Sequence, residues 1–235
     1  MRLDKYLVTL GIGSRSQVKE YVRKGLVTVN DAVCRNSDTK VDETADRVAF
    51  QGRELVYKKN RYYMLHKPAG VITATRDREE RTVLELLGPE VVKKDLSPMG
   101  RLDKDTEGLL LITDDGELNH LLLSPRHHVD KCYLVYTALP VSMEAAEMLR
   151  QGVEIGEDKP TLPACVELTG DRELLLTIQE GKFHQVKRML QAVDNQVIYL
   201  KRISFGGLTL DPALQKGQYR ELTKEEVLLL RTAVK

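Results

Sequence analysis

Cysteine is scarce in this sequence, and its scarcity limits the kind of protein that the chain can be. Cys34, Cys132 and Cys165 are the three cysteines among 235 residues, and they lie far apart along the chain. An odd number of widely spaced cysteines argues against a disulfide framework and is typical of a protein in a reducing compartment. We therefore expect a cytoplasmic protein in which each cysteine is a small buried side chain.

Long apolar runs are also missing. Although apolar residues make up 42% of the chain, no stretch approaches the roughly 18 consecutive apolar residues that indicate a membrane-spanning helix. The first residues, MRLDKYLVTLG, contain neither a secretory apolar region nor a cleavage site. We expect an ordinary hydrophobic core and no membrane partner.

A strong charge of either sign is absent as well, because the formal net charge is only +1. Bulk charge therefore does not indicate a nucleic-acid partner, but the charges are unevenly distributed. Residues 1–58 contain 11 Lys and Arg against 8 Asp and Glu, whereas the remainder contains 25 against 27. Because local patches decide phosphate contacts, the first 58 residues are the better candidate for nucleic-acid binding.

The sequence has none of the short motifs that bind common cofactors or metals. There is no Walker loop, no dinucleotide-binding glycine pattern and no His and Cys spacing that suits zinc. The five histidines are His66, His120, His127, His128 and His184, and none belongs to a metal-binding pattern. We expect neither a cofactor nor a metal.

The most distinctive stretch is GRLDKDTEGLLLITDDG, from Gly100 to Gly116. Leu109 to Ile112 is a four-residue apolar run between turn-forming residues, which predicts a buried strand. Asp103 therefore lies on a polar loop that leads into the core, a common position for a reactive group. An Asp in such a loop more often makes local turn hydrogen bonds, so the loop alone does not assign a catalytic role.

The N-terminal region predicts a small module of two helices followed by short strands. The apolar spacing indicates an amphipathic helix over residues 2–10 and a second helix that begins near Ser14 and ends before Gly25. A polar linker is expected over 51–61. Basic residues lie on the two helices: Arg2, Lys5, Arg15, Lys19, Arg23 and Lys24. By themselves such charges are more often a solvated helix face than a binding surface.

The rest of the chain predicts more strands than helices. Strands are expected over 62–65, 71–73, 109–112, 131–137, 162–168, 173–178, 197–200 and 203–210, and helices over 82–87, 116–123, 140–151, 224–233 and from about 183. For the K-P-x-G turn at 67–70, a structural role is at least as well supported as a contact role for Lys67. Because the strand spacing is irregular, we predict an α+β domain on a mixed, largely antiparallel sheet.

Two segments resemble known families. G-R-L-D followed by T-x-G-L-L-L-x-T-x-D-G is similar to the signature of the pseudouridine synthases that modify ribosomal RNA, and most similar to the ribosomal small-subunit pseudouridine synthase A family. R-L-D-K-x-L, S-R-S-Q-x-K and G-x-V-x-V-N resemble the alpha-L RNA-binding motif of ribosomal small-subunit protein four. The resemblance implies an alpha-L RNA-binding module over residues 1–58, linked to a pseudouridine synthase catalytic domain over 59–235.

The resemblance also implies a set of site residues. Asp103 corresponds to the nucleophile, Tyr133 of K-C-Y to the tyrosine against the target base, and Lys187 of H-Q-V-K to the basic partner of the nucleophile, with Arg188 as the alternative. Relatives from other branches have Arg in place of this lysine. We expect RNA contacts among Arg101, Arg126, His127, His128, Lys131, Lys182, His184 and Arg188, in addition to the basic residues of the module, with Arg101 as a candidate wedge.

The implied reaction is the isomerisation of one uridine in 16S ribosomal RNA, uridine 516, without a cofactor. A 23S target and a non-catalytic RNA-binding or ribosome-assembly protein are the alternatives. A hydrolase that pairs Asp103 with Asp105 or Asp114 is weaker, since side chains two residues apart in an extended loop point to opposite sides. We expect a monomer whose partner is ribosomal RNA, either naked or within an assembling small subunit.

Overall fold

The computed structural model describes residues 1–43, 45–55, 57, 60–88, 91 and 95–234. The chain divides into two compact units, Met1–Lys59 and Asn60–Lys235. Across the described residues, no helix is both long and apolar enough to cross a membrane.

The first unit has two helices and a four-stranded sheet. Helices α1 (Leu3–Thr9) and α2 (Arg15–Arg23) precede strands β1 (Val27–Val29), β2 (Ala32–Val33), β3 (Val48–Phe50) and β4 (Arg53–Leu55), arranged in the order β2-β1-β3-β4. Ser14 caps α2 through a capping box with Gln17. The two helices and the sheet share a core of Leu3, Tyr6, Leu7, Val18, Val22, Val27, Val41 and Val48. The two predicted helices are confirmed.

The predicted linker over 51–61 is wrong in its first half. Gln51 and Gly52 have positive φ values of 50° and 78°, the geometry of a tight hairpin turn. They connect β3 to β4, and Phe50 pairs with Arg53 across the turn. The sequence is polar here because this hairpin lies at the edge of a small sheet, where Arg53 and Glu54 are exposed. A polar strand of this kind was mistaken for a linker.

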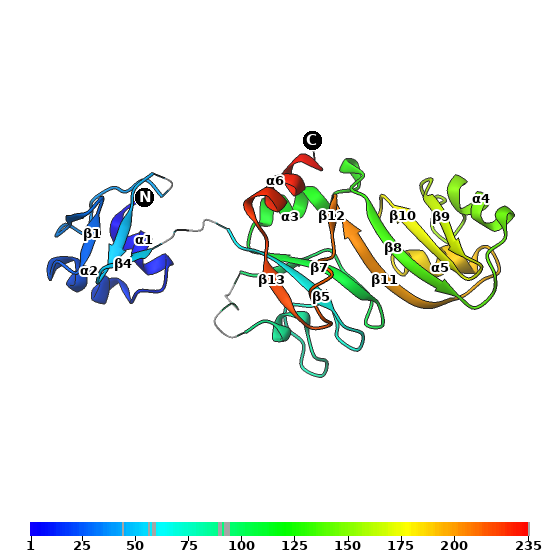
Figure 1. Cartoon of the computed structure of the whole chain (residues 1–235), viewed down its shortest axis with the longest axis horizontal. Helices are drawn as coiled ribbons and strands as arrows, with labels where there is room; N and C mark the ends of the chain where they lie inside the picture. Colours follow the sequence, from blue (N-terminus) through cyan, green and yellow to red (C-terminus); the bar gives the residue numbers. More distant parts are fainter. Residues whose placement is uncertain (44, 56, 58–59, 89–90, 92–94, 235) are drawn as a thin grey trace. The chain divides into compact units, whose positions relative to one another are not determined.

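The second unit is built on one large sheet (Figure 1). Its order is β13-β5-β7-β11-β8-β10-β9, with β6 paired to β7 and β12 paired to β11. The strands are β5 (Tyr62–Lys67), β6 (Ser97–Met99), β7 (Glu107–Thr113), β8 (Lys131–Thr137), β9 (Cys165–Gly170), β10 (Glu173–Ile178), β11 (Val197–Phe205), β12 (Leu208–Thr209) and β13 (Tyr219–Glu221). Only the β7–β11 pair is parallel among these ladders. The predicted α+β class with a largely antiparallel sheet is confirmed.

Helices cover both faces of this sheet, and each face has its own core. Helices α4 (Met143–Gln151) and α5 (Gln185–Gln191) contribute to one core, whereas α3 (Gly116–Leu123) and α6 (Lys224–Thr232) contribute to the other. Strand β7 lies between the two cores. Leu110 and Ile112 belong to the first core and Leu109 and Leu111 to the second. Burial on both faces explains why this strand is a continuous apolar run.

Several boundaries differ from the sequence expectation. Residues 197–200 and 203–210 were expected as two strands, but β11 runs without a break to Phe205 and Gly206–Gly207 forms the turn into β12. Residues 82–87 contain a short 3₁₀ helix, η1 (Val83–Leu86), and the loop after α3 contains another, η2 (Pro125–His127). The expectation of three buried cysteines is wrong, because Cys165 is exposed and the other two are half-buried.

Candidate active site

The loop before β7 is fixed through its backbone. The N–H of Thr106 donates to the carbonyl of Asp103 at 3.1 Å, which makes residues 103–106 a turn. The Thr73 hydroxyl donates to the Leu102 carbonyl at 2.7 Å and accepts from the Leu102 N–H at 3.1 Å. Leu102 itself is buried in the core. These contacts hold the backbone around Asp103 and leave its side chain out of the hydrogen bonds that form the turn.

Lys67 lies beneath this loop and is fully buried. Its Nζ donates to the carbonyls of Pro68, Lys104 and Thr106 at 3.0, 3.3 and 2.8 Å. Burial lowers the pKa of Lys67 to about 8, against a smaller opposing effect of the nearby carboxylates, of which Asp105 is the largest. Lys67 therefore ties the end of β5 to the turn after Asp103. Its contacts are structural, in agreement with the structural interpretation of the K-P-x-G turn.

A cavity of about 570 Å³ opens beside the loop. Asp103, Tyr133 and Lys187 all line it, although they come from the loop, from β8 and from α5. The Asp103 Oδ2 lies 3.0 Å from the Lys187 Nζ, and the Asp103 side chain is 26% exposed. The Tyr133 side chain is buried in the cavity wall. The three residues that the motifs indicated are thus brought to one cavity, with an accessible carboxylate at its edge.

Lys187 contacts two carboxylates, since its Nζ also donates to Asp105 Oδ1 at 2.6 Å. Burial lowers the pKa of Lys187, but the hydrogen bonds with Asp105 and Asp103 outweigh it and the pKa is raised. For Asp105, burial raises the pKa, yet the Lys187 hydrogen bond prevails and the pKa is lowered. These shifts favour an ion pair between the Lys187 ammonium and the Asp105 carboxylate, and the Asp103 side chain lies 3.0 Å from the same ammonium.

The expectation that Asp103 and Asp105 point to opposite sides is wrong. The turn closed by Thr106 replaces the extended backbone on which that expectation rested, so both carboxylates reach the same lysine. A hydrolase pair does not follow, because Asp105 is held ionised and a general acid needs a raised pKa. Asp114 accepts from the Arg61 N–H after the far end of β7, so it is no partner either.

Phe183 at the cavity mouth was missed by sequence reasoning, whereas its stacking partner His184 was among the expected RNA contacts. The Phe183 ring stacks on the His184 ring with centroids 3.8 Å apart and an interplanar angle of 18°. Phe183 is 74% exposed, and both residues line the cavity. His184 has a positive φ of 48°, and its Nε2 lies 3.6 Å from Asp103 Oδ1. An aromatic residue at the start of a predicted helix was the one signal available in the sequence.

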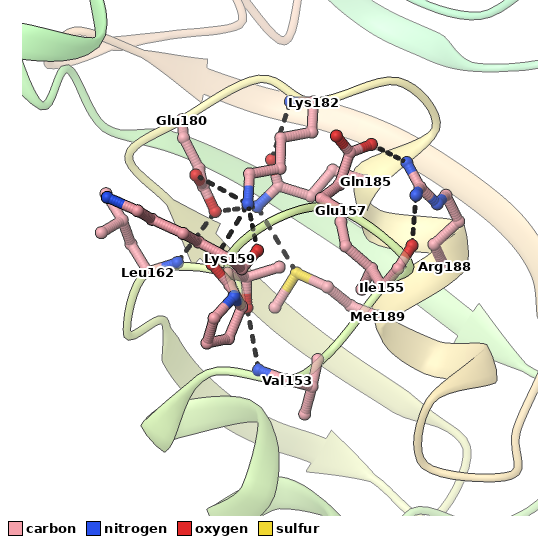
Figure 2. A network of polar contacts seen from close by, with 12 residues as sticks. Val153, Ile155, Glu157, Lys159, Leu162, Glu180, Lys182, Gln185, Arg188 and Met189 are labelled. Atoms are coloured by element: carbon pink, nitrogen blue, oxygen red, sulfur yellow. Dashed lines mark hydrogen bonds and ion pairs between the residues drawn. The ribbon is translucent and has the colours of Figure 1, made fainter.

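Two of the expected RNA contacts are engaged within the protein. Lys182 donates to the carbonyls of Lys159 and Pro160 at 3.0 and 3.1 Å, and Arg188 contacts Glu157 and the carbonyls of Ile155 and Phe183. Figure 2 shows Lys182 with Glu180 and Gln185, and Arg188 beside Ile155 and Glu157. These side chains attach the segment after α4 to the start of α5. They hold the loop that presents Phe183 and His184.

The other expected RNA contacts of the second unit divide by exposure. Arg101, Arg126 and His128 are exposed, and His127 is half-exposed. Arg101 lines the cavity next to Asp103, whereas Lys131 lies buried in its wall. Lys131 is thus no surface contact, because its side chain is buried and its ammonium donates to the Val129 carbonyl.

In the first unit, most of the basic residues present a charged surface. Arg15, Lys19 and Arg23 are exposed at four-residue intervals on α2, so they form one stripe along the helix. Lys5 is exposed on α1. Arg2 is paired with Asp4 and Asp38, and Lys24 with Glu20 at 2.7 Å. We name the stripe of Arg15, Lys19 and Arg23 the α2 basic stripe.

Within the part of the chain that the structure describes, no group of three His, Cys, Asp or Glu side chains could hold a metal ion. The three residues that the motifs indicated bring a carboxylate, an ammonium and a phenol to the cavity. A carboxylate positioned beside a cavity can act as a nucleophile or stabilise a developing cation.

Comparison with known proteins agrees with this arrangement. The RNA pseudouridylate synthase family model matches residues 61–192, and the S4 domain model matches residues 1–48. The chain therefore belongs to the RNA pseudouridylate synthase family, and it is an RNA pseudouridine synthase with an N-terminal S4 domain.

Three relatives and one solved structure show how far the similarity extends. The chain is 46% identical to an uncharacterised RNA pseudouridine synthase of Bacillus subtilis over 98% of both chains. It is 46% and 44% identical to the ribosomal small subunit pseudouridine synthases A of Vibrio cholerae and Escherichia coli, over 97% of this chain and 98% of each relative. The crystal structure of a pseudouridylate synthase matches with a TM-score of 0.70 and 36% identity, over 98% of this chain and 99% of that chain.

Proposed function

We propose that this protein isomerises one uridine of 16S ribosomal RNA, uridine 516, with Asp103 as the nucleophile. The names of the Vibrio cholerae and Escherichia coli relatives support the small ribosomal subunit as the source of the substrate. The observation that carries the proposal is the Asp103 carboxylate, accessible at the cavity and 3.0 Å from the Lys187 ammonium.

Isomerisation requires a bond to break without loss of the base. The C1′–N1 bond breaks with its electron pair remaining on N1, and the ribose accepts the Asp103 carboxylate. The base then turns, the bond between Asp103 and C1′ breaks with its electron pair returning to the carboxylate, and C1′ bonds to C5. The C5 proton then leaves and N1 gains a proton. No oxidant, reductant or group donor takes part. A single carboxylate at the sugar is therefore sufficient as the nucleophile.

Lys187 and Tyr133 support this carboxylate. The Lys187 ammonium lies 3.0 Å from the Asp103 carboxylate and restricts its orientation. Tyr133, in the cavity wall, offers a ring for the turned base to lie against and a phenol that can remove the C5 proton. Both residues come from elements of the rigid sheet and helix scaffold, so their distance from Asp103 varies little.

The target uridine has to leave its stack before it can enter the cavity. Arg101, exposed beside Asp103, is placed to fill the space that the base leaves. The stacked Phe183–His184 pair at the mouth offers an aromatic surface to a neighbouring base. Arg126, His127 and His128 remain proposed phosphate contacts, since they follow α3 near the same cavity, which Pro125 lines.

A 23S ribosomal RNA target is the second candidate, because the Bacillus subtilis relative is named only as an RNA pseudouridine synthase. Mapping pseudouridines in 16S and 23S RNA from cells with and without the protein distinguishes the two. Loss of pseudouridine at 16S position 516 is the expected result, and loss in 23S RNA alone contradicts it. We further propose that the protein acts in the cytoplasm, as a monomer, on naked RNA or on an assembling small subunit.

Asp103→Asn tests the nucleophile. We expect the variant to keep its fold and its affinity for RNA but to lose at least about a thousandfold in single-turnover isomerisation, because an amide cannot form the bond to the ribose.

Asp105→Asn is the matched control, since Asp105 has the same side chain and contacts the same lysine but is largely exposed. It should slow isomerisation by about tenfold or less. If the two variants retain similar rates, Asp103 is not the nucleophile.

A further inference from the structure

Two buried cations lie in the wall of the same cavity. Lys131 on β8 is 8% exposed and Arg202 on β11 is 1% exposed, and both line the cavity. The Arg202 Nε donates to the Leu109 carbonyl at 2.8 Å. Its Nη2 is buried and has no hydrogen-bond partner among the described residues. Such an orphaned donor in a folded protein calls for an explanation.

The Lys131 ammonium likewise has fewer hydrogen bonds than it has donors. Its Nζ donates to the Val129 carbonyl at 2.8 Å, its one hydrogen bond among the described residues. Both cations lie over the Phe205 ring, at 5.5 Å for Lys131 and 5.1 Å for Arg202. A cation–π contact attracts a cation but leaves its N–H donors unused. The pair therefore has hydrogen-bonding capacity directed to no protein group.

Lys67 is a buried lysine of the same unit with a structural role, and its hydrogen bonds provide a comparison. Its Nζ contacts three backbone carbonyls, so each of its donors has an acceptor. Within the described residues, neither Lys131 nor Arg202 has a carboxylate at ion-pair distance. Burial first, and then the Arg202 charge, lower the pKa of Lys131 to about 8. The Asp130 and Glu180 carboxylates oppose this lowering with smaller effects. Two neighbouring buried cations with no carboxylate at ion-pair distance are costly, unless a negatively charged ligand offsets the cost.

The position of this pair points to the base of the guest nucleotide. Arg202 pairs directly with Tyr133 across β11 and β8, so the two side chains lie side by side on one face. The ribose of the substrate has to meet Asp103 at the loop, and its phosphates belong to a strand that remains outside. The buried cations therefore face the part of the nucleotide that enters furthest, which is the uracil ring.

We propose that Lys131 and Arg202 form a site for the carbonyl edge of the extruded uracil and stabilise the negative charge that the base holds while it is detached. This inference rests on the proposed function. When the C1′–N1 bond breaks, the electron pair stays on N1 and the charge spreads over O2 and O4. Donors held in place in a buried site stabilise such a charge more than water does. The same contact keeps the free base in the cavity while it turns.

Sulfur substitution in the RNA, combined with substitution in the protein, tests the contact. The substrate is a ribosomal RNA fragment with uridine, 2-thiouridine or 4-thiouridine at the target position, because sulfur accepts hydrogen bonds more weakly than oxygen. Single-turnover isomerisation is measured for the full-length wild type, Lys131→Met, Arg202→Met and Arg202→Lys. Lys201→Met is the matched control, since Lys201 is the neighbouring β11 residue on the opposite face.

For the wild type and Lys201→Met, sulfur at the contacted oxygen should slow the reaction about 10- to 100-fold, the value of one charged hydrogen bond. In Lys131→Met or Arg202→Met the unmodified RNA should react slowly and the sulfur effect should shrink to about twofold or less, because the contact is already lost. Arg202→Lys, which keeps the charge, should recover part of the rate.

Sulfur effects of equal size in the wild type and in both Met variants would assign the two cations a structural role and overturn the proposal. A methylphosphonate beside the target uridine tests a phosphate contact in the same way. If the Met variants reduce the rate effect of the methylphosphonate but not the rate effect of sulfur, the proposal is also overturned. A wild type that leaves the unmodified RNA unchanged contradicts the proposed function, and with it this site. Circular dichroism and RNA affinity show whether each variant is folded.

Discussion

At the scale of single residues, Lys187 differs from the arginine of other branches in how it meets its carboxylates. An arginine presents a planar fork that binds one carboxylate through two parallel bonds. The Lys187 ammonium is a point charge with three donors, and it divides them between Asp103 at 3.0 Å and Asp105 at 2.6 Å. Asp105 is therefore a second anchor for the Lys187 ammonium. It restricts the position of the ammonium beside Asp103, which the planar fork of an arginine would do by itself.

Lys67→Met tests the buried lysine under the loop through the pH dependence of stability. Lys67 has a pKa of about 8 when folded, and its ordinary value is 10.5. Between these pH values the unfolded chain binds more protons, so raising the pH stabilises the folded wild type. As the pH rises, the free energy of unfolding should increase more for the wild type than for the variant. The difference should grow by at most about 1.4 kcal/mol per pH unit.

Urea unfolding at several pH values between 8 and 10.5 measures this difference. The charged groups that face Lys67 are Asp105, Asp103, Glu107 and Lys187, and all four remain in the variant. The variant should be less stable at every pH, because three carbonyls lose their donor. A difference that stays constant over this range would mean that Lys67 is not desolvated.

Motifs singled out Asp103, Tyr133 and Lys187, which the structure brings to one cavity, because each belongs to a short pattern of adjacent residues. Phe183 and Arg202 were not predictable in the same way. Phe183 stands out through its exposure at the cavity mouth, and Arg202 through a strand pairing with Tyr133 that joins positions far apart in the sequence. Burial and neighbourhood depend on tertiary packing, which no local pattern of residue types expresses.

At the scale of elements, the parallel pairing of β7 and β11 depends on one glycine. Gly108 pairs with Arg202, and a Cβ at Gly108 would lie 2.2 Å from the Arg202 carbonyl oxygen. Its φ of +106° also disfavours any other residue. Because β7 follows the Asp103 loop and β11 holds Arg202, this close approach determines how the two sides of the cavity meet.

Gly108→Ala should therefore destabilise the catalytic domain by about 3–5 kcal/mol, through strain and backbone displacement together. Gly217→Ala is the control, since Gly217 has a φ of +86° but open space around it. It should cost about 1–2 kcal/mol, the conformational strain alone. The midpoints of urea unfolding compare the two. Equal losses would show that β11 moves away from the new methyl group at little cost.

Elements with a strong local pattern were predicted well, and those defined by pairing were not. Strands 131–137 and 173–178 and helix 116–123 coincide with β8, β10 and α3, because their apolar spacing and flanking turns are complete in themselves. The short strands β6 and β13 were missed. Each has three residues and forms only by adding to the sheet, on β7 and β5 respectively. Their sequences, SPM and YRE, have no strand pattern of their own.

At the scale of the whole molecule, the chain joins an RNA-binding unit to a catalytic one. In the proposed function the cavity accepts one nucleotide, but a single nucleotide does not distinguish one uridine from another. Sequence selection therefore needs contacts outside the cavity. The α2 basic stripe offers three exposed cations at regular spacing, and phosphate contacts of this kind position a protein on RNA.

The α2 basic stripe predicts a salt-dependent share of the RNA affinity. Replacing Arg15, Lys19 and Arg23 with Gln should weaken binding to the ribosomal RNA fragment and lower the slope of log K against log salt by about 2 to 3. The matched control replaces Lys40, Arg47 and Arg53, which are exposed in the same unit but lie outside α2. Both variants lose three charges, so a difference between them reports position and not net charge. Equal slopes, measured by RNA binding between 50 and 200 mM salt, would contradict a role for the stripe, because an equal loss is what bulk electrostatics alone would give.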